Sequence, residues 1–546
     1  MNKSADKLQA SSLLIHISGL LVLTLVLSLI YSNSFQGPFV FDDSFNIVNK
    51  VSMQMNHLSL RSIQRAAFEG ANHRRWLPNL SFGINYYLGG HNVWGYHLVN
   101  LVIHIMTAMV LYGFCFTTLT LPKLDFCNRR AAEISLITAF LWAVHPVQTN
   151  AVTYIVQRMT SMASLFYLAC LLLYIKGRLH KKPLQKYLLW VSSFICGLLA
   201  LVSKENSAVL PLIILAYEFY FLKDRHRRIL TRRNLLWLGM SLLSVVIIGW
   251  IYIGHVSLGW LLNGYAHRDF TLTERLLTES RIVFHYLTLL ILPLPSRLNL
   301  AYDYDISHSL FAPPITLAAT LGIILSVALT VYLFKNHRLL SFGLFWFLAN
   351  LVIESTFIPL ELIFEHRLYL PSTILILAVV AATYKLWDVR RTNLLRLLLT
   401  ACLVTLCFFT WQRNEVWSSE IGVWRDVVLK SPDLARGYIQ LGRAYVKNER
   451  FQEAFDLFES VADKKYEAPD FDTTGIYNHW GMAAFQLGKI DRAVELFEHV
   501  VQLDRTHWEG HYNLGLAYGS QGKMAEARRE MALGMQLQQI KKAAIQ

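Results

Sequence analysis

The chain has 546 residues, of which 54% are hydrophobic and only 16% are charged. Its mean hydropathy of +0.36 excludes an ordinary soluble globular protein of this length. The net charge of +14 is compatible with nucleic-acid binding, but the Lys and Arg residues lie in short runs between apolar segments. Because that pattern orients membrane helices, we expect membrane lipid as a partner and no nucleic acid.

The first apolar segment follows Lys3 and Lys7 and runs from about Ser12 to Tyr31. It is long enough to cross a bilayer, and its flanks lack the small-residue cleavage pattern of a signal peptide. We therefore predict an uncleaved first span. The cysteines form no CxxC pair, which argues against a disulfide framework and against a thiolate metal site.

About eleven segments have the length and apolar character of membrane spans. They lie near 12–32, 96–117, 134–145, 158–177, 187–203, 205–222, 234–255, 314–334, 339–357, 368–387 and 393–411. With the N-terminus inside, this number places the basic clusters in the cytoplasm and the C-terminal region outside. Residues 278–293 are also apolar, but a crossing there would reverse the later clusters. We expect them to form a re-entrant or interfacial helix in an outer loop.

A sequence repeat begins beyond Trp411, where the composition becomes that of a soluble helical domain. Small and aromatic residues recur with tetratricopeptide spacing in units that start at about 435, 474 and 508. The recurring residues are Tyr438, Leu441, Gly442, Tyr445, Ala454 and Phe458, then Trp480, Gly481, Ala493 and Phe497, then Leu514, Gly515, Tyr518 and Ala527. The small residues let paired helices approach closely.

These patterns predict an all-α protein with two domains. Residues 1–411 form a polytopic membrane helical bundle whose first outer loop covers 33–95. Residues 412–546 form an α-solenoid of tetratricopeptide repeats on the outer side of the membrane, and such solenoids typically bind extended peptides.

An acidic pair, Asp42 and Asp43, lies about ten residues beyond the first span, on the predicted outer side. Sugar transfer from a phosphate carrier needs a carboxylate that accepts the proton of the acceptor hydroxyl as that oxygen attacks the anomeric carbon. An acidic pair near the membrane surface suits this role. The alternative is an Asx turn or a helix N-cap, which Asp-Asp-Ser forms readily.

Two arginines are candidate ligands of a leaving lipid phosphate. Arg367 opens a span at its outer end, and Arg158 opens another. A fixed guanidinium can hold the charge that develops on a phosphate. Each could instead anchor its helix in the headgroup region.

Further ionisable residues at the predicted outer face are expected to support the site; they are His145, Lys204, Glu205, Glu365 and His366. Lys204 and Glu205 could alternatively be a self-neutralised pair in a short turn. His97 and His104 are about two helical turns apart, too far to chelate one metal ion.

A series of motifs runs along nearly the whole chain in one order. It comprises Phe41-Asp42-Asp43 with Asn46-Ile47, the stretch His97 to His104, His145 to Thr149, Tyr154 to Arg158, Ser203 to Asn206 and Glu365 to Ser372, followed by the repeats. Together these motifs resemble the transmembrane and tetratricopeptide-repeat-containing O-mannosyltransferases, and they are most similar to that family's bacterial relatives.

This resemblance implies a GT-C glycosyltransferase fold, a polyprenyl-phosphate-linked sugar as donor and an inverting transfer. It implies that Asp42 or Asp43 is the base and that Arg367 contacts the donor phosphate. It leaves open which aspartate acts and whether a divalent cation is needed. The chain departs from the animal enzymes in having about three repeats and Gln157-Arg158-Met159-Thr160 in place of a Gly-Arg-Ala-Asp-like stretch, which leaves the acceptor and the sugar open.

The leading hypothesis is a membrane glycosyltransferase that moves a sugar, possibly mannose, from a polyprenyl-phosphate donor to Ser or Thr of an extracytoplasmic protein held by the repeats. A bacterial cytoplasmic membrane with the repeats in the periplasm is the expected location. The alternative is a non-catalytic scaffold that recruits envelope partners. A transporter should show inverted internal repeats, which the sequence does not suggest.

Overall fold

The computed structural model describes residues 3–545 except 125–126, 128–129, most of 224–262, 267, 388–391 and 462–472. This described part is helical throughout, with one isolated β-bridge between Ser309 and Ala312. The all-α prediction is therefore confirmed. The chain divides into two compact units: the first holds 1–266, 270–300 and 305–418, and the second holds 267–269, 301–304 and 419–546.

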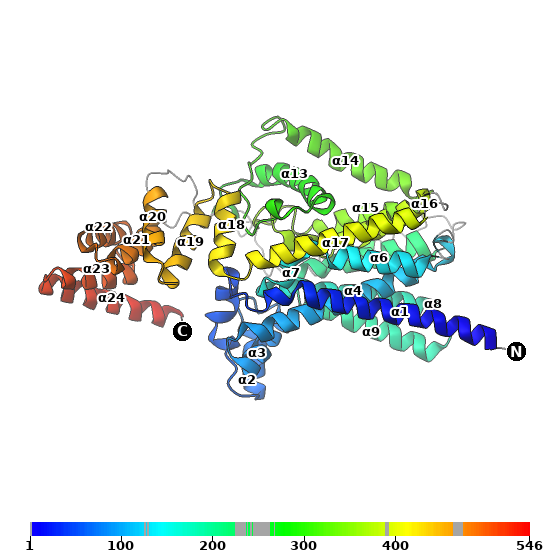
Figure 1. The fold of residues 1–546 in the computed structure, drawn as a ribbon, viewed down its shortest axis with the longest axis horizontal. Helices are drawn as coiled ribbons and strands as arrows, with labels where there is room; N and C mark the ends of the chain where they lie inside the picture. The colour runs from blue at the N-terminus through cyan, green and yellow to red at the C-terminus, as the bar shows by residue number, and fades with distance from the viewer. Residues whose placement is uncertain are drawn as a thin grey trace. The chain divides into compact units, whose positions relative to one another are not determined.

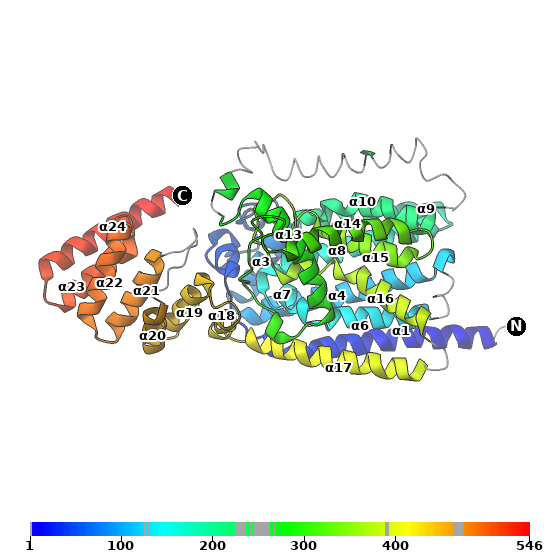
Figure 2. The same ribbon diagram turned by 90° about the horizontal axis from the view of Figure 1, so that it is seen from above.

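Long apolar helices build the first unit (Figures 1 and 2). They are α1 (Lys3–Ile30), α4 (Val93–Leu119), α6 (Ala131–Ala143), α8 (Arg158–Leu179), α9 (Pro183–Leu201), α10 (Leu210–Tyr217), α14 (Ile315–Leu333), α15 (Arg338–Leu351), α16 (Ser372–Leu386) and α17 (Thr392–Val416). They cover the predicted spans except 234–255, which falls almost entirely outside the described residues.

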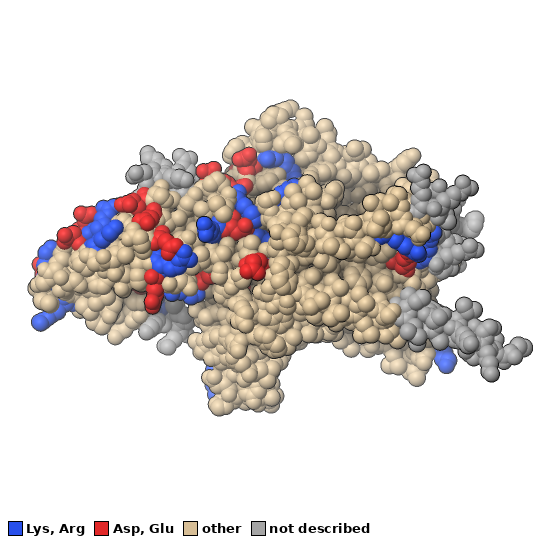
Figure 3. All heavy atoms as spheres, in the orientation of Figure 1, with Lys and Arg blue, Asp and Glu red and all other residues tan. Residues whose placement is uncertain are grey.

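Seven helical segments of the described part are long and apolar enough to cross a membrane, and α6, α15 and α16 are shorter apolar helices. The chain is thus an integral membrane protein. In Figure 3 the visible middle of these helices is free of charged side chains. Large apolar side chains are exposed there, such as Phe194 on α9 and Leu325 on α14, and lipid is the solvent that suits them.

The interior of the first unit lies where α4 packs between α1, α6 and α8, and where α16 packs between α6 and α15. Bulky side chains fill it, among them Phe114, Trp142 and Trp346. The Trp142 indole N–H donates to the carbonyl of Tyr369, and that of Trp346 donates to the carbonyl of Leu370. These two bonds fix the start of α16 and therefore the preceding segment, which carries Arg367.

Short helices occupy the predicted outer loop 33–95. The loop contains a five-residue π-helix (Ser44–Val48), α2 (Leu60–Phe68) and α3 (Trp76–Gly89). The side chain of Ser59 caps α2 by accepting from the backbone N–H of Ser62. The apolar segment 278–293 belongs to α13 (Leu272–Ile291), which begins earlier than predicted because Thr271 and Glu274 form a capping box.

Paired helices build the second unit. They are α18 (Glu420–Lys430), α19 (Ala435–Lys447), α20 (Phe451–Val461), α21 (Thr473–Gln486), α22 (Ile490–Leu503), α23 (Trp508–Ser520) and α24 (Met524–Ile545). Gly481 faces the ring of Phe497, and Gly442 faces that of Phe458 in the same way, so the small residues allow the close approach expected of the repeat. The third pair differs, because Gly515 faces Met531. The predicted domain end at 411 falls inside α17.

Candidate active site

Asp43 anchors the outer loop to the helices beneath it. Its side chain is buried, one carboxylate oxygen accepts from the backbone N–H of Val40 at 2.9 Å, and the other accepts from that of Val156 at 2.7 Å. Burial raises the pKa of Asp43 to about 8, although the two backbone donors and the nearby Arg158 act in the opposite direction. A carboxylate with both oxygens engaged in this way is a structural clamp.

Asp42 differs from its neighbour in being half-exposed. The hydroxyl of Tyr154 accepts from the backbone N–H of Asp42 at 2.9 Å and also hydrogen-bonds the Asp42 side chain. Phe41, just before the pair, has a φ of +51°, a backbone strain that bulky residues rarely adopt and that concentrates at functional sites. The loop thus leaves Asp42 partly exposed while Asp43 holds the loop in place.

Arg158 is fully buried and makes contacts within the protein. Its guanidinium donates to the side chain of Asn100 at 2.7 Å, to the carbonyl of Tyr96 at 3.0 Å and to the hydroxyl of Ser81 at 3.2 Å. It also stacks 4.5 Å above the ring of Phe82. In this arrangement Arg158 joins the outer loop to α4.

Lys204 and Glu205 do not neutralise each other; each forms an ion pair with a partner from another part of the chain. The Lys204 ammonium lies 2.7 Å from the carboxylate of Glu354, with both side chains buried. The Glu205 carboxylate accepts from the guanidinium of Arg75, which belongs to the outer loop. The self-neutralised alternative is therefore wrong for this turn, and the pair ties three outer segments together.

Arg367 lies at the edge of the same charged region. Its guanidinium donates to the carbonyls of Glu361 and Leu362, and it is 3.9 Å from the carboxylate of Glu279 on α13. Glu279 also pairs with Arg275 at 2.8 Å, inside the same helix. The Nε atom of Arg367 is buried and makes no hydrogen bond within the described part of the chain.

Two other predicted supporting residues, His366 and His145, lie beside this region and make different contacts. His366 is buried and its Nδ1 hydrogen-bonds Asn150 at 2.8 Å, while its pKa is lowered by burial and by the neighbouring Lys204 and Arg367. The ring of His145 caps the turn that follows it and contacts the carbonyl of Leu290. These histidines are neutral packing elements in this arrangement.

Among the predicted supporting residues, Glu365 lies close to a cation on a helix of the bundle. Its buried carboxylate accepts from the backbone N–H of Asn299 and lies 3.9 Å from the guanidinium of Arg413 near the end of α17. The sequence did not single out Arg413, since it sits at the end of an apolar run where an anchoring role is ordinary.

One short segment, residues 154–160, connects the acidic pair to the cationic region. Tyr154 contacts Asp42 and the Val156 N–H contacts Asp43. Further along, the sulfur of Met159 contacts Arg75 and the hydroxyl of Thr160 contacts Lys204 at 3.2 Å. The segment that leads into α8 and the first turn of α8 therefore contact both aspartates and two of the cations.

The charged region carries more positive than negative groups. Its cations are Arg75, Lys204, Arg275 and Arg367, and its carboxylates are Glu205, Glu279 and Glu354. These side chains form a connected network of ion pairs near the acidic pair.

Comparison with known proteins agrees with this architecture. A family model described as "Tetratricopeptide repeat" matches residues 479–535. A protein O-mannosyl-transferase of Caenorhabditis elegans is 25% identical over 472 residues, which cover 79% of this chain and 60% of that relative. The human protein O-mannosyl-transferases TMTC1 and TMTC4 are 30% and 32% identical over 36% and 38% of this chain, and the matches cover 23% and 30% of those proteins.

The chain is related to the transmembrane, tetratricopeptide-repeat-containing protein O-mannosyltransferases. The match spans 60% of the nematode relative and less than a third of the two human ones. The resemblance seen in the sequence motifs is thus confirmed at the level of the family. The bacterial assignment stays a prediction.

Sequence reasoning missed Arg275 and Glu279, which hold α13 against the segment before Arg367. A signal was present, because Thr271-Leu272-Thr273-Glu274 has the spacing of a capping box and places both residues one turn apart on the same helix face. Within the described residues, no group of three or more His, Cys, Asp or Glu side chains is arranged to hold a metal ion.

Proposed function

We propose that this membrane protein transfers a sugar, with mannose as the first candidate, from a polyprenyl-phosphate donor to a Ser or Thr hydroxyl of a protein. The single observation that carries the proposal is that the half-exposed Asp42 and the cations Arg75 and Lys204 all contact one short segment, residues 154–160. The relatives are protein O-mannosyl-transferases, which suggests the reaction class.

Asp42 is the proposed base. Its carboxylate accepts the proton of the acceptor hydroxyl as the hydroxyl oxygen forms a bond to the anomeric carbon. The bond from that carbon to the phosphate oxygen breaks, and the electron pair leaves with the polyprenyl phosphate. Tyr154, which hydrogen-bonds Asp42, orients the carboxylate.

The cationic region is the proposed site of the donor phosphate. A sugar phosphodiester carries one negative charge, and the departing lipid phosphate gains a second as the bond breaks. Cations fixed in a water-poor site stabilise such a developing charge strongly. We assign the direct contact to Arg367, because its Nε is buried without a hydrogen bond in the described part of the chain.

The repeats are proposed to hold the acceptor protein at the non-cytoplasmic membrane surface, which in a bacterial cell is the periplasmic side of the cytoplasmic membrane. A tethered acceptor has a high effective concentration at the site without new contacts to the sugar. No cofactor is proposed beyond the lipid-linked donor.

Transfer by the purified protein in lipid vesicles tests the proposal. Labelled polyprenyl-phosphate mannose and a Ser/Thr-containing acceptor are supplied, and Asp42→Asn is compared with the unaltered chain. Loss of a general base lowers rates by about a hundredfold to ten-thousandfold. Asp305→Asn is the matched control, since Asp305 is an exposed acid elsewhere in the same unit.

Two results would contradict the proposal. Transfer that survives Asp42→Asn would remove the proposed base. An unaltered protein that transfers no sugar from several polyprenyl-phosphate sugars, while its repeats still capture a partner, would favour the scaffold alternative.

A further inference from the structure

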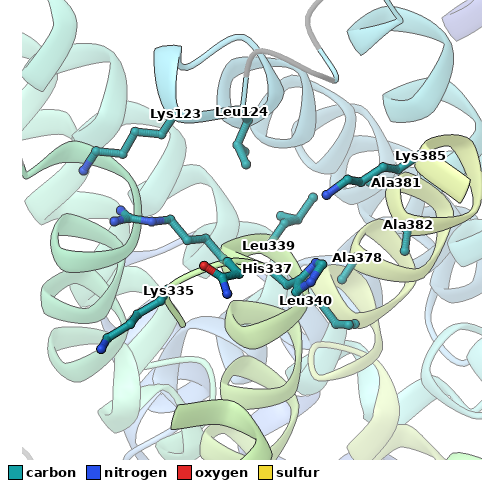
Figure 4. Close-up of a pocket in the computed structure, with 12 residues that line it drawn as sticks. Lys123, Leu124, Lys335, His337, Leu339, Leu340, Ala378, Ala381, Ala382 and Lys385 are labelled. Atoms are coloured by element: carbon teal, nitrogen blue, oxygen red, sulfur yellow. The ribbon is translucent and has the colours of Figure 1, made fainter. Parts of the chain in front are cut away.

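The cavity beside the start of α15 has a volume of about 470 Å³, and cations line it (Figure 4). Each of these cations has interactions within the protein; they are Lys123, Lys335, Arg338 and Lys385. Arg338, for example, donates to the carbonyl of Tyr220 at 2.8 Å, and the Lys123 ammonium donates to that of Lys223. These contacts join separate segments of the first unit, so the charge of the cavity serves the fold. Polar groups that stay open to a ligand lie in the repeats instead.

An amide pair joins α21 and α23, the first helices of two successive repeats. The Nδ2 of Asn513 donates to the Oδ1 of Asn478 at 3.0 Å. Asn478 is only 2% exposed, whereas Asn513 is half-buried. A buried amide costs stability unless hydrogen bonds satisfy its polar atoms, and this single bond engages only one atom of each side chain.

Each member of the pair keeps one open polar atom. Within the described part of the chain, the Nδ2 of Asn478 and the Oδ1 of Asn513 make no further hydrogen bond. Neither atom is sealed from solvent. If both amides turned over, one NH₂ group and one carbonyl oxygen would still remain open. The pair therefore offers a ligand one donor and one acceptor on adjacent helices.

One donor and one acceptor are the complement of a single residue in an extended peptide. Every residue other than proline carries one backbone N–H and one backbone C=O. In an extended strand these two groups of one residue point the same way, as in the hydrogen-bonded pairs of an antiparallel sheet. One residue of a segment that crosses α21 and α23 can therefore accept from Asn478 and donate to Asn513, whatever its side chain.

Apolar side chains continue this surface beside the amide pair. Met482 and Phe485 follow Asn478 by about one and two turns of α21, and they are half-buried against the repeat core. Leu516 follows Asn513 by about one turn of α23 and is 37% exposed. Because α21 packs against both α19 and α23, the first helices of the repeats form one continuous surface. Apolar neighbours keep water away from the amides, which strengthens the hydrogen bonds that a peptide makes there.

We propose that Asn478 and Asn513 bind the backbone of an extended peptide, so that the repeats hold many sequences alike. The role of that peptide as the acceptor rests on the proposed function, whereas its binding does not. Backbone recognition leaves the choice among Ser and Thr residues to the transfer site. A bound peptide also satisfies the two polar atoms that the empty repeats leave without a hydrogen bond in the described part of the chain.

Fluorescence anisotropy of the full-length protein in lipid nanodiscs measures the binding of a short labelled peptide of Ser, Thr and Ala residues. In the double variant Asn478→Leu, Asn513→Leu, we expect the affinity to fall about thirtyfold, the change that two neutral hydrogen bonds contribute. The double replacement removes both amides together and keeps the side-chain shape, so it leaves neither partner of the pair unsatisfied. Gln502→Ala is the control, since Gln502 is an exposed amide on α22, the second helix of its pair.

Changes in the peptide give a second readout that leaves the protein unaltered. A peptide of the same composition in another order should bind equally well. A peptide with methylated backbone nitrogens should bind about fivefold more weakly, because it cannot donate to Asn513. Full affinity of the methylated peptide, or a strong dependence on residue order, would overturn backbone recognition.

Equal affinity in the double variant and the unaltered protein, or no binding by the unaltered protein, would overturn the site. Should the double variant not fold, Asn513→Ala at the half-buried position gives the same comparison with an expected loss of about fivefold. Sugar transfer is measured separately on the same proteins. Peptide binding that depends on the amide pair without any sugar transfer would support the site and contradict only the proposed function.

Discussion

Replacing Asp43 with Asn should release the outer loop, whereas replacing Asp42 with Asn should leave the loop in place and stop transfer. The Asp43 carboxylate accepts one backbone hydrogen bond with each oxygen, from Val40 and from Val156. An Asn keeps one acceptor oxygen and sets an amide N–H₂ against the other backbone N–H. With the raised pKa the group is mostly neutral near pH 7, so the lost hydrogen bond contributes about 0.5–1.5 kcal/mol, and the buried backbone donor left without an acceptor costs about 1–3 kcal/mol more.

We therefore expect Asp43→Asn to destabilise the closed loop by about 3 kcal/mol, which is about a hundredfold more frequent opening. Hydrogen exchange measures this directly, because the amide N–H of Val156 exchanges only when the loop opens. Asp42→Asn is the matched control, since its backbone N–H still donates to Tyr154. Equal exchange at Val156 in the Asp43→Asn and unaltered proteins would refute the clamp.

The pH dependence provides a second readout of the same carboxyl group. Its folded pKa of about 8 lies above the unfolded value of 3.8. Between these values the folded protein holds a proton that the unfolded chain has released, so the stabilisation is complete below pH about 4 and is lost as the pH rises to about 8. Loop protection should thus fall from pH 5 to pH 8.5, and Asp43→Asn should abolish this slope.

Three further predictions concern topology and the repeats. Gln64→Cys and Lys523→Cys should both react with an impermeant thiol reagent on intact cells, because both segments are predicted to be outside; labelling of one alone would break the eleven-span arrangement. Gly481→Val should destabilise the repeat region by about 1–3 kcal/mol, since a Cβ there would lie 2.6 Å from the ring of Phe497, and protease resistance of the full chain measures this. Deleting 433–546 should raise KM for a protein acceptor far more than for a short Ser/Thr peptide; equal losses would mean that the repeats serve folding.

The deletion point follows from a contact that the sequence does not reveal. The hydroxyl of Ser431 donates to the carbonyl of Ala301 at 3.1 Å and accepts from the backbone N–H of Asp303 at 3.0 Å. A truncation that keeps Ser431 leaves both bonds intact. Any change in kinetics then reports on the repeats themselves.

Helix positions were predictable from the sequence because each span is a continuous apolar run bounded by charged residues, and because the repeat places Gly442 and Gly481 where helices must touch. The same periodicity could not separate Asp42 from Asp43, which are adjacent and chemically identical. The difference arises from Tyr154 and Val156, more than a hundred positions away in the chain. Only the folded arrangement shows that the Asp43 carboxylate is a buried clamp while Asp42 stays partly exposed.

The ion-pair partners could not be predicted from the sequence for the same reason. Lys204 and Glu205 are neighbours in the sequence, so the simplest expectation is that they form an ion pair with each other. At the start of a helix, however, adjacent side chains point in different directions. Arg158 was predicted to contact phosphate because it opens a span; its guanidinium donates to Asn100, Ser81 and Tyr96 in the structure, and its phosphate role stays a prediction. A buried arginine needs several hydrogen-bond acceptors, and the sequence alone does not show which residues supply them.

The proposed function explains why so many charges are kept in one buried region. Each ion held in a water-poor environment costs several kcal/mol, and the ion pairs of the region offset that cost. Under the proposed function, an anionic donor would add a favourable interaction with these cations when it binds. Because a ligand that binds only the folded state stabilises it, the donor should protect the outer loop as well as occupy the site. The loop contributes Arg75 to the same charged region, so under the proposed function donor binding should favour the closed loop that carries Asp42.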